Sequence, residues 1–211
     1  MSIQTPRRVG RPDQQASEEL VRRILDAAAR LFVNQGYADT SIEQIAAAAC
    51  SGKQTIYRRF SSKERLFMEV ISRQAERLLE VARAAESRRA NPIDALKESC
   101  RLLLEFALHP DMVRLHRILV AEVERFPNLG EYVLDNCMSP FKAVLERLLR
   151  AAMDAGQLRE MDVALAYALL SSLVTGWPIR RAMLSSGRLD RREDRDAFFE
   201  AAWGLFLRGA A

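Results

Sequence analysis

A short polar and cationic segment, residues 53–59, carries the side chains best suited to chemistry in this chain of 211 residues. Its amide, hydroxyl, ammonium and guanidinium groups donate hydrogen bonds and attract negative charge. The amide of Gln54 can pair with N6 and N7 of adenine, and Arg58 can reach a base or a phosphate. The segment therefore predicts contact with DNA. Its outward residues are Lys53, Gln54, Thr55, Tyr57, Arg58 and Arg59.

The elements around this segment predict a helix-turn-helix. A longer helix is expected from Ser17, as N-cap, to Gly36, as C-cap. A capping box at 40–43 opens a short helix, and residues 50–52 form a break of about three residues before the polar segment. A second capping box at 61–64 opens a long helix. Two short helices joined by such a turn can place the second in the major groove of a duplex.

The charge distribution agrees with a basic N-terminal head on a neutral body. Residues 1–65 hold 11 Lys and Arg against 7 Asp and Glu, whereas residues 66–211 hold 21 of each. The whole excess of the net charge of +4 therefore lies in the first third. A concentrated positive charge favours a polyanionic partner, and ordinary surface charge is the alternative explanation.

Two stretches of the head resemble the signature of the TetR family of transcriptional repressors. Residues 45–60 read IAAAACSGKQTIYRRF and are followed by SKE at 62–64. Residues 27–42 fit the pattern AAxxLFxxxGYxxTSI. The resemblance implies a homodimer that binds a palindromic double-stranded operator. It also implies that the second short helix reads the groove, that Tyr57 contacts the DNA backbone and that Lys63 contacts phosphate; we add Thr40 to the expected DNA contacts.

The turn departs from the family pattern. It reads Cys-Ser-Gly at 50–52 where Gly-Val-Ser is usual, Gln54 replaces a usual Gly, and Arg59 replaces a usual His. We expect Cys50 to take a left-handed backbone at a cost of about 1 kcal/mol relative to Gly. Gly52 is expected to cap the next helix less well than Ser. These changes bear on local stability more than on the fold, and Gln54 adds a base reader.

A basic arm precedes the head. Residues 1–16 are expected to be disordered, and Arg7, Arg8, Gly10, Arg11 and Pro12 lie in a sequence that resembles an AT-hook core. Such an arm can place Arg7, Arg8 and Arg11 in a narrow minor groove, where the potential is most negative. A solvated basic tail is the alternative.

Residues 66–211 are expected to form one helical body, so the predicted fold is all-α, with DNA-binding residues 17–65 in front of it. Good helix formers dominate the composition, and no stretch resembles a strand. The last two helices carry more apolar surface than one pair can hide, which predicts a dimer seam or, alternatively, an internal core. The seam residues predicted are Leu169, Leu173, Phe199, Trp203 and Phe206.

The body also predicts a ligand pocket. Residues 117–130, RILVAEVERFPNLG, resemble a motif of the AefR-like branch of the family, whose bodies usually enclose a chamber. The expected ligand is a small hydrophobic or amphipathic molecule. The predicted lining residues are Phe106, Met112, His116, Leu119, Phe141, Tyr167 and Trp177, each of which can instead be plain core.

Other function classes find little support. The chain has two histidines and neither a GxSxG sequence nor a P-loop, so we expect no enzyme, no cofactor and no metal site.

Three separated cysteines and the lack of an apolar N-terminal stretch predict a cytoplasmic protein. The uncharged run at 163–179 is predicted to be a buried helix, with no membrane partner. A DNA-binding regulator without a small ligand remains the second hypothesis.

Overall fold

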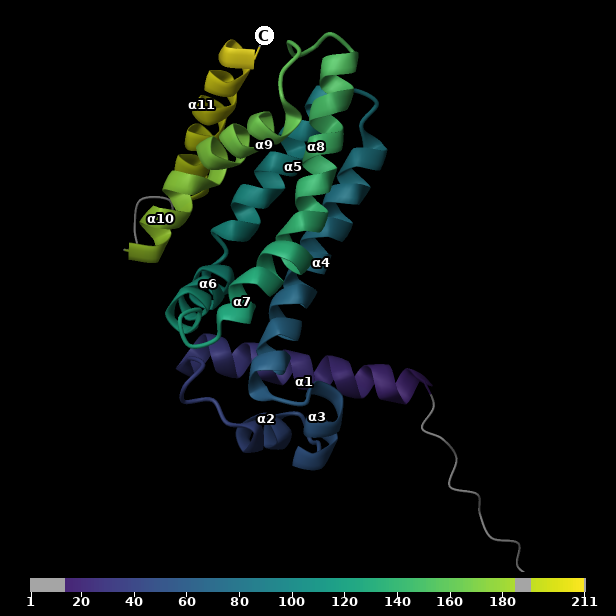
Figure 1. The fold of residues 1–211 in the computed structure, drawn as a ribbon, viewed down its shortest axis with the longest axis vertical. Helices are drawn as coiled ribbons and strands as arrows, with labels where there is room; N and C mark the ends of the chain where they lie inside the picture. Colours follow the sequence, from purple (N-terminus) through teal and green to yellow (C-terminus); the bar gives the residue numbers. More distant parts are fainter. Residues whose placement is uncertain (1–13, 185–190, 211) are drawn as a thin grey trace, which may run out of the picture. The chain divides into compact units, whose positions relative to one another are not determined.

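The computed structural model describes residues 14–184 and 191–210, and every element in these ranges is helical (Figure 1). The predicted all-α fold is confirmed. The helices divide into two compact units, with the division between Val70 and Ile71. The sequence places this boundary slightly earlier, after residue 65.

The first unit is built from three helices and the start of a fourth. They are α1 (Gln14–Gln35), α2 (Ile42–Ala48), α3 (Lys53–Phe60) and the first turns of α4 (Lys63–Arg88). Figure 1 shows α2 and α3 on the same side of α1. The core of this unit consists of side chains at helical spacing from all four helices, which explains why such short helices persist. Its fully buried members include Ile24, Ala28, Phe32, Ile45, Ile56, Leu66 and Phe67.

The start of α2 differs from the expected capping box by one residue. Ser41 is the N-cap: its Oγ accepts from the Gln44 N–H at 3.1 Å, and the Gln44 Oε1 accepts from the Ser41 N–H at 2.7 Å. Thr40 is instead 1% exposed, and its hydroxyl donates to the carbonyl of Gly36 at 2.6 Å. The predicted box at 40–43 was therefore wrong in register, because the Thr40 hydroxyl is used to close the preceding turn.

Two other helix starts also move by a few residues. The first helix begins at Gln14, ahead of the predicted cap at Ser17. At the start of α4, the Oγ of Ser62 accepts from the Arg65 N–H at 3.0 Å. Ser61 instead ends α3 with a φ of 57°. Local side-chain capping thus holds the start of α4, one residue later than the sequence predicted.

The turn between α2 and α3 has the backbone that its composition predicts. Cys50 adopts a φ of 49°, and Gly36, which ends α1, a φ of 85°. Gly52 is the N-cap of α3 and provides no side-chain hydrogen bond. The predicted left-handed Cys50 and weak Gly52 cap are both confirmed. A residue with a Cβ is strained at a positive φ, so Cys50 costs the turn stability that a glycine would not.

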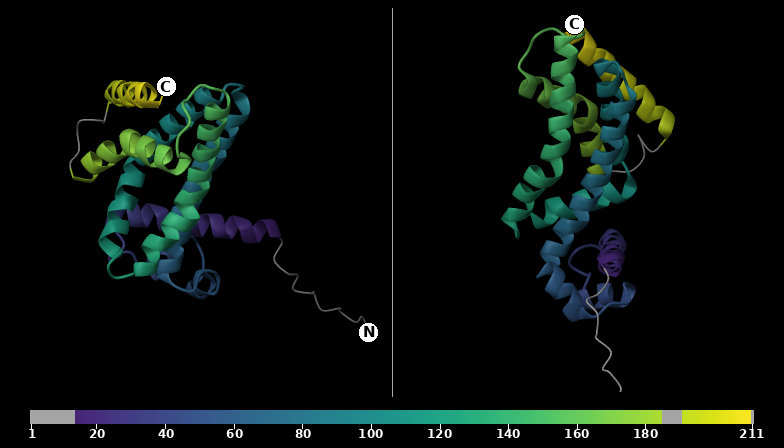
Figure 2. Two further views of the ribbon diagram at one scale, coloured as in Figure 1. Left: turned by 45° about the horizontal axis from the view of Figure 1, so that its top comes forward. Right: turned by 90° about the vertical axis from the view of Figure 1, so that its right-hand side faces the viewer.

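The long helices of the second unit pack side by side. The helices α5 (Pro92–Ala107) and α8 (Ser139–Asp154) are neighbours. Both views of Figure 2 show α8 beside the later part of α4 as well. Arg147 of α8 forms a two-pronged ion pair with Glu86 of α4, at 3.0 and 2.8 Å. Around this layer lie α6 (Pro110–Glu122), α7 (Pro127–Tyr132), α9 (Val163–Ser171), α10 (Trp177–Leu184) and α11 (Arg192–Ala210).

Two turns of π-helix interrupt the longer helical runs of this unit. The element η1 (Val133–Met138) joins α7 to α8, and η2 (Ser172–Gly176) joins α9 to α10. Each ends two residues before a proline, Pro140 or Pro178. A proline has no N–H for the helical ladder and its ring clashes with the carbonyl four residues earlier, so the ladder opens there. A π turn thus precedes each of these two prolines.

The apolar segment at 163–184 is less buried than predicted. Among the described residues it is the one helical stretch long and apolar enough to span a membrane by composition, and only 22% of it is buried. Leu165 and Leu169 are 58% and 55% exposed. The run predicted to be a buried helix is therefore only partly buried in a single chain: one side of α9 packs on α8, and the other side is exposed.

Replacement of Cys50 by Gly tests the strain in the turn. We expect Cys50→Gly to raise the free energy of unfolding by about 1 kcal/mol, because glycine adopts a positive φ without a Cβ clash. Urea unfolding followed by circular dichroism measures this. Ala47→Gly, at an exposed position inside α2, is the matched control and is expected to lower stability by about 0.5–1 kcal/mol. A loss of stability in both variants would contradict strain at Cys50.

Candidate functional site

The outward face of α3 is polar and exposed. Ile56 and Phe60 are 1% and 6% exposed and hold the inner face of the helix. With about 100° between successive residues, Gln54 and Arg58 then project from the opposite face, and both are exposed. Tyr57 is 43% exposed beside them. An amide, a guanidinium and a phenol are thus presented together from one rigid helix.

The remaining predicted residues of α3 lie at the edges of this face. Lys53 pairs with Glu43 of α2, which raises the pKa of the lysine and lowers that of the glutamate, and its ammonium stands 5.7 Å from the Tyr57 ring centre. Arg59 donates to the hydroxyl of Ser17 in α1. Thr55 is half-buried. These side chains remain at the surface, so the cationic character of the face is kept.

Lys63, for which the family resemblance implies a phosphate contact, donates hydrogen bonds to backbone carbonyls inside the head. Its ammonium donates to the carbonyls of Tyr37 at 2.8 Å, Ala38 at 3.4 Å and Thr40 at 2.9 Å. It also lies 4.3 Å from the centre of the Tyr37 ring. The ammonium thus binds three carbonyls of the loop between α1 and α2. Thr40, another predicted DNA contact, is buried in the same loop, so the structure gives both residues a structural position.

The basic arm with Arg7, Arg8 and Arg11 lies outside the described residues.

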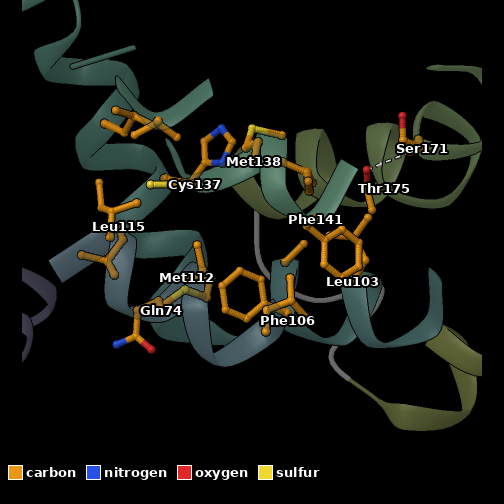
Figure 3. Close-up of a pocket in the computed structure, with 18 of the residues that line it drawn as sticks. Gln74, Leu103, Phe106, Met112, Leu115, Cys137, Met138, Phe141, Ser171 and Thr175 are labelled. Carbon is orange, nitrogen blue, oxygen red and sulfur yellow. Dashed lines mark hydrogen bonds between the residues drawn. The ribbon is translucent and has the colours of Figure 1, made fainter. Parts of the chain in front are cut away.

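The second unit contains a cavity of about 270 Å³. Figure 3 shows side chains from several helices directed into it. The wall combines α4, α5, α6, η1, α8, α9, η2 and α10, so most of the unit contributes. The lining residues are Ile71, Gln74, Ala75, Leu78, Leu103, Phe106, Ala107, Met112, Leu115, His116, Leu119, Val133, Cys137, Met138, Phe141, Tyr167, Ser171, Thr175 and Ile179.

Most of the residues predicted for a pocket lie around this cavity. Those that line it are Phe106, Met112, His116, Leu119, Phe141 and Tyr167. Trp177 lies elsewhere: its ring stacks on Phe198 of α11 at 5.4 Å between ring centres, and it is 40% exposed. The η2 turn ends just before Trp177, and the ring packs on α11 and away from the cavity.

Polar groups occur at separate places on the apolar wall. Figure 3 shows Gln74 at one end and Ser171 and Thr175 at the other, with Phe106 and Phe141 between them. Sequence reasoning missed these three residues. Gln74 interrupts an apolar stripe of α4, and the two hydroxyls lie four residues apart in an otherwise apolar run. A polar residue at a position that the helical period predicts to be buried was the available signal.

Side-chain hydrogen bonds fix two parts of the cavity wall. The hydroxyl of Ser72 in α4 lies 2.9 Å from the Tyr132 hydroxyl and 3.5 Å from the Cys137 sulfur, which ties η1 to α4. Arg117 of α6 donates to the carbonyls of Met183 at 3.1 Å and Ala182 at 2.6 Å, near the end of α10. Helix-end carbonyls have no partners within the helix, so this arginine satisfies them while it joins two pocket helices.

The predicted dimer residues divide between the core and the surface. Phe199, Trp203 and Phe206 are 0%, 4% and 6% exposed and belong to the core of this single chain. They lie on the side of α11 that packs on this core, so they offer almost no surface to a second copy. This corrects their prediction as dimer residues. Leu173 is partly buried against the same core, and Leu169 is exposed. The exposed large apolar residues of the last helices include Leu165, Leu169, Trp177, Leu184 and Leu205.

Within the described residues, no group of three or more His, Cys, Asp or Glu side chains is arranged to hold a metal ion.

Comparison with protein families assigns both units. Residues 24–70 match the family described as bacterial regulatory proteins, tetR family. Residues 94–209, more than half of the chain, match the AefR-like transcriptional repressor, C-terminal domain. The chain belongs to the TetR family. The resemblances to the TetR head and to the AefR-like body are both confirmed, and the protein is a DNA-binding transcriptional regulator of the repressor type.

Individual relatives support this assignment over most of the chain. This TetR-family protein is 30% identical over 201 residues to the transcriptional repressor NicS of Pseudomonas putida, covering 87% of this chain and 86% of the relative. A putative TetR-family regulator from Mesorhizobium loti shares its fold with a TM-score of 0.82 at 24% identity, covering 92% and 97% of the two chains. The flavonoid-responsive regulator FrrA has a TM-score of 0.67 at 28% identity, covering 91% and 97%.

Replacement of Lys63 distinguishes a structural from a phosphate-binding position. We expect Lys63→Met to destabilise the α1–α2 loop by on the order of 2 kcal/mol, because three carbonyls lose a charged donor. Hydrogen exchange of the backbone amides at 36–45, measured by mass spectrometry without DNA, should become faster. Lys53→Met is the control and should leave this exchange nearly unchanged, because an exposed ion pair contributes little. Unchanged exchange in Lys63→Met together with weaker DNA binding would favour the phosphate contact.

Proposed function

We propose that this protein is a homodimeric repressor that binds a palindromic DNA operator and is released when a small molecule occupies the cavity of its body. The observation that carries the proposal is the joint presence of an exposed reading face on α3 and a lined cavity in the second unit. Each matches a separate part of the TetR family, the head and the AefR-like body. The protein would act in the cytoplasm, where the operator is located.

The exposed face of α3 supports sequence-specific DNA binding. Gln54 lies in the first turn of α3, where a recognition helix meets base edges in the major groove. Its amide has the donor and acceptor pair that matches adenine. Arg58 lies on the same face one turn later and reaches a base or a phosphate, whereas Tyr57 at the edge suits the DNA backbone. The basic arm would add minor-groove contacts through Arg7, Arg8 and Arg11.

The open apolar side of the last helices supports a homodimer. Leu165 and Leu169 of α9 and Leu205 of α11 are each more than half exposed in a single chain. A symmetric pairing would bury this surface, and a two-fold dimer is the commonest way for a soluble protein to do so. Two heads in such a dimer would meet half-sites about 34 Å apart, one turn of DNA, which explains why the operator should be palindromic.

The cavity supports control by a small molecule. Its mainly apolar wall with a few polar groups is typical of binding pockets for small ligands, and its volume of about 270 Å³ lies just below their usual range. The relative FrrA is named as a flavonoid-responsive regulator, so a protein of this fold at 28% identity responds to a small compound. A regulator without a ligand would more readily fill this space with side chains, so the cavity favours the ligand-controlled alternative.

Substitution of Gln54 tests the reading of DNA. A selection from random duplexes first defines the preferred operator. We expect Gln54→Ala to lose about 1–3 kcal/mol of discrimination at one base position of each half-site. Tyr57→Ala should instead weaken binding to all sequences and make it less dependent on salt, because it removes a backbone contact. The same preferred sequence for wild type and Gln54→Ala would remove Gln54 as a base reader.

The release mechanism predicts reciprocal coupling between DNA and pocket. The fluorescent compound N-phenyl-1-naphthylamine, which is apolar and uncharged, can serve as the pocket probe. We expect the selected operator to weaken the binding of this probe by about 5- to 150-fold, the same factor by which the probe weakens operator binding. Fluorescence titrations with operator and with a scrambled duplex measure the effect. Equal probe affinities in the two titrations would contradict ligand-controlled release.

A further inference from the structure

We infer that the cavity selects an uncharged, largely aromatic or aliphatic ligand that donates a hydrogen bond to the hydroxyl pair Ser171 and Thr175. This inference rests on the proposed function, because it specifies what the pocket of the regulator accepts. Three observations carry it: the charge of the wall, the direction of its hydrogen bonds and its shape.

The first observation is the charge of the wall. Among the described residues that line the cavity, none is Asp, Glu, Lys or Arg. The two titratable side chains with shifted values both shift toward neutrality: burial lowers the pKa of His116 and raises that of Tyr167. A carboxylate, phosphate or ammonium would therefore enter without a counter-ion, and burial of an unpaired charge is strongly unfavourable. The wall thus selects against ionised molecules.

The second observation is the direction of the hydroxyl hydrogen bonds. The Thr175 hydroxyl donates to the Ser171 carbonyl at 2.8 Å, and the Ser171 hydroxyl donates to the Ala168 carbonyl at 3.2 Å. Each hydroxyl has one proton, and both protons are used within the helix. Ser171 also shares a side-chain hydrogen bond with Tyr167, whereas the lone pairs of the Thr175 oxygen can accept from a ligand. This end of the cavity therefore matches a ligand O–H or N–H group.

The third observation is the arrangement of the wall between its polar ends. Figure 3 shows Phe106 and Phe141 between the hydroxyl pair and Gln74. Aromatic side chains pack well against a ring in stacked or edge-on geometry. The cavity volume of about 270 Å³ is slightly below the range of about 300–1,000 Å³ usual for ligand pockets, so the ligand is small. Gln74 can donate or accept at the far end, so this end accepts either kind of uncharged polar group.

Two dyes that differ by a single sulfonate test the charge preference. N-phenyl-1-naphthylamine is neutral, and 1-anilinonaphthalene-8-sulfonate carries the same rings with a negative charge. We expect the full-length protein to bind the neutral dye at least about tenfold more tightly. Ala107→Trp, which fills the cavity, should abolish this binding, whereas Ala143→Trp on the exposed side of α8 should not. Equal or tighter binding of the sulfonate, or binding that survives Ala107→Trp, would overturn the inference.

A charge added to the wall should reverse the preference. Gln74→Lys places an ammonium at one end of the cavity and should strengthen binding of the sulfonated dye relative to the neutral one. Gln74→Met is the matched control, since it keeps the length of the side chain without the charge, and should retain the neutral preference. An unchanged ratio of the two affinities in Gln74→Lys would show that the sulfonate is not excluded by charge and would overturn the inference.

A second pair of compounds tests the hydrogen-bond direction. 2-Naphthol donates a hydrogen bond, and 2-methoxynaphthalene has the same rings without the donor. We expect 2-naphthol to displace the neutral dye about three- to tenfold better, and this advantage should disappear in the double variant S171A/T175V. Equal displacement by the two compounds in the wild type would refute the hydroxyl contact.

The outcomes separate this inference from the proposed function. If the neutral dye binds in the cavity but does not affect operator binding, release by ligand fails while the ligand class stands. If the sulfonated dye binds preferentially and releases the operator, the ligand class is wrong while the regulatory function stands. If neither dye binds the wild type, the inferred ligand class is overturned.

Discussion

The burial of two apolar side chains, Ile56 and Phe60, is the constraint on which the polar outward face of α3 depends. A helix as short as α3 has little stability of its own and is held by its packed side. Because successive residues are separated by about 100°, the burial of these two residues fixes the orientation of the helix about its own axis. Gln54 and Arg58 are exposed as a direct consequence. The chemistry of the face is therefore set by residues that never touch DNA.

The loop behind this helix is stabilised by polar groups that the sequence shows only indirectly. Lys63 satisfies carbonyls of the α1–α2 loop, and the Thr40 hydroxyl satisfies that of Gly36. The rings of Phe32, Tyr37 and Phe67 pack beneath, with centres 5.1 to 5.7 Å apart. The loop is thus fixed by one cation and one aromatic cluster, and the start of α2 is fixed with it.

The sequence predicted the fold class and the order of the two units, and most of the residues it named for a pocket line the cavity. These predictions depend on patterns that act locally, such as the helical period behind Phe106 and Phe141 and the positive φ at Cys50. The sequence could not decide between partners where a side chain has two that are chemically reasonable. Lys63 could face phosphate or backbone carbonyls, and Phe199 and Trp203 could face a second chain or their own core. Only the three-dimensional packing decides between such partners, because hydrophobicity and charge are the same in both cases.

The two π turns have a consequence for how the cavity of this protein can change during evolution. A π turn contains one residue more than the α-helical turn it replaces, and such insertions are often found at functional sites. Deletion of a single residue from η1 or η2 would restore a regular helix and rotate every later position by about 100°. Phe141 and Ile179, which follow these turns, would then leave the wall and others would enter. One-residue insertions and deletions at these places would reshape the cavity wall while α5, which precedes both turns, keeps its register.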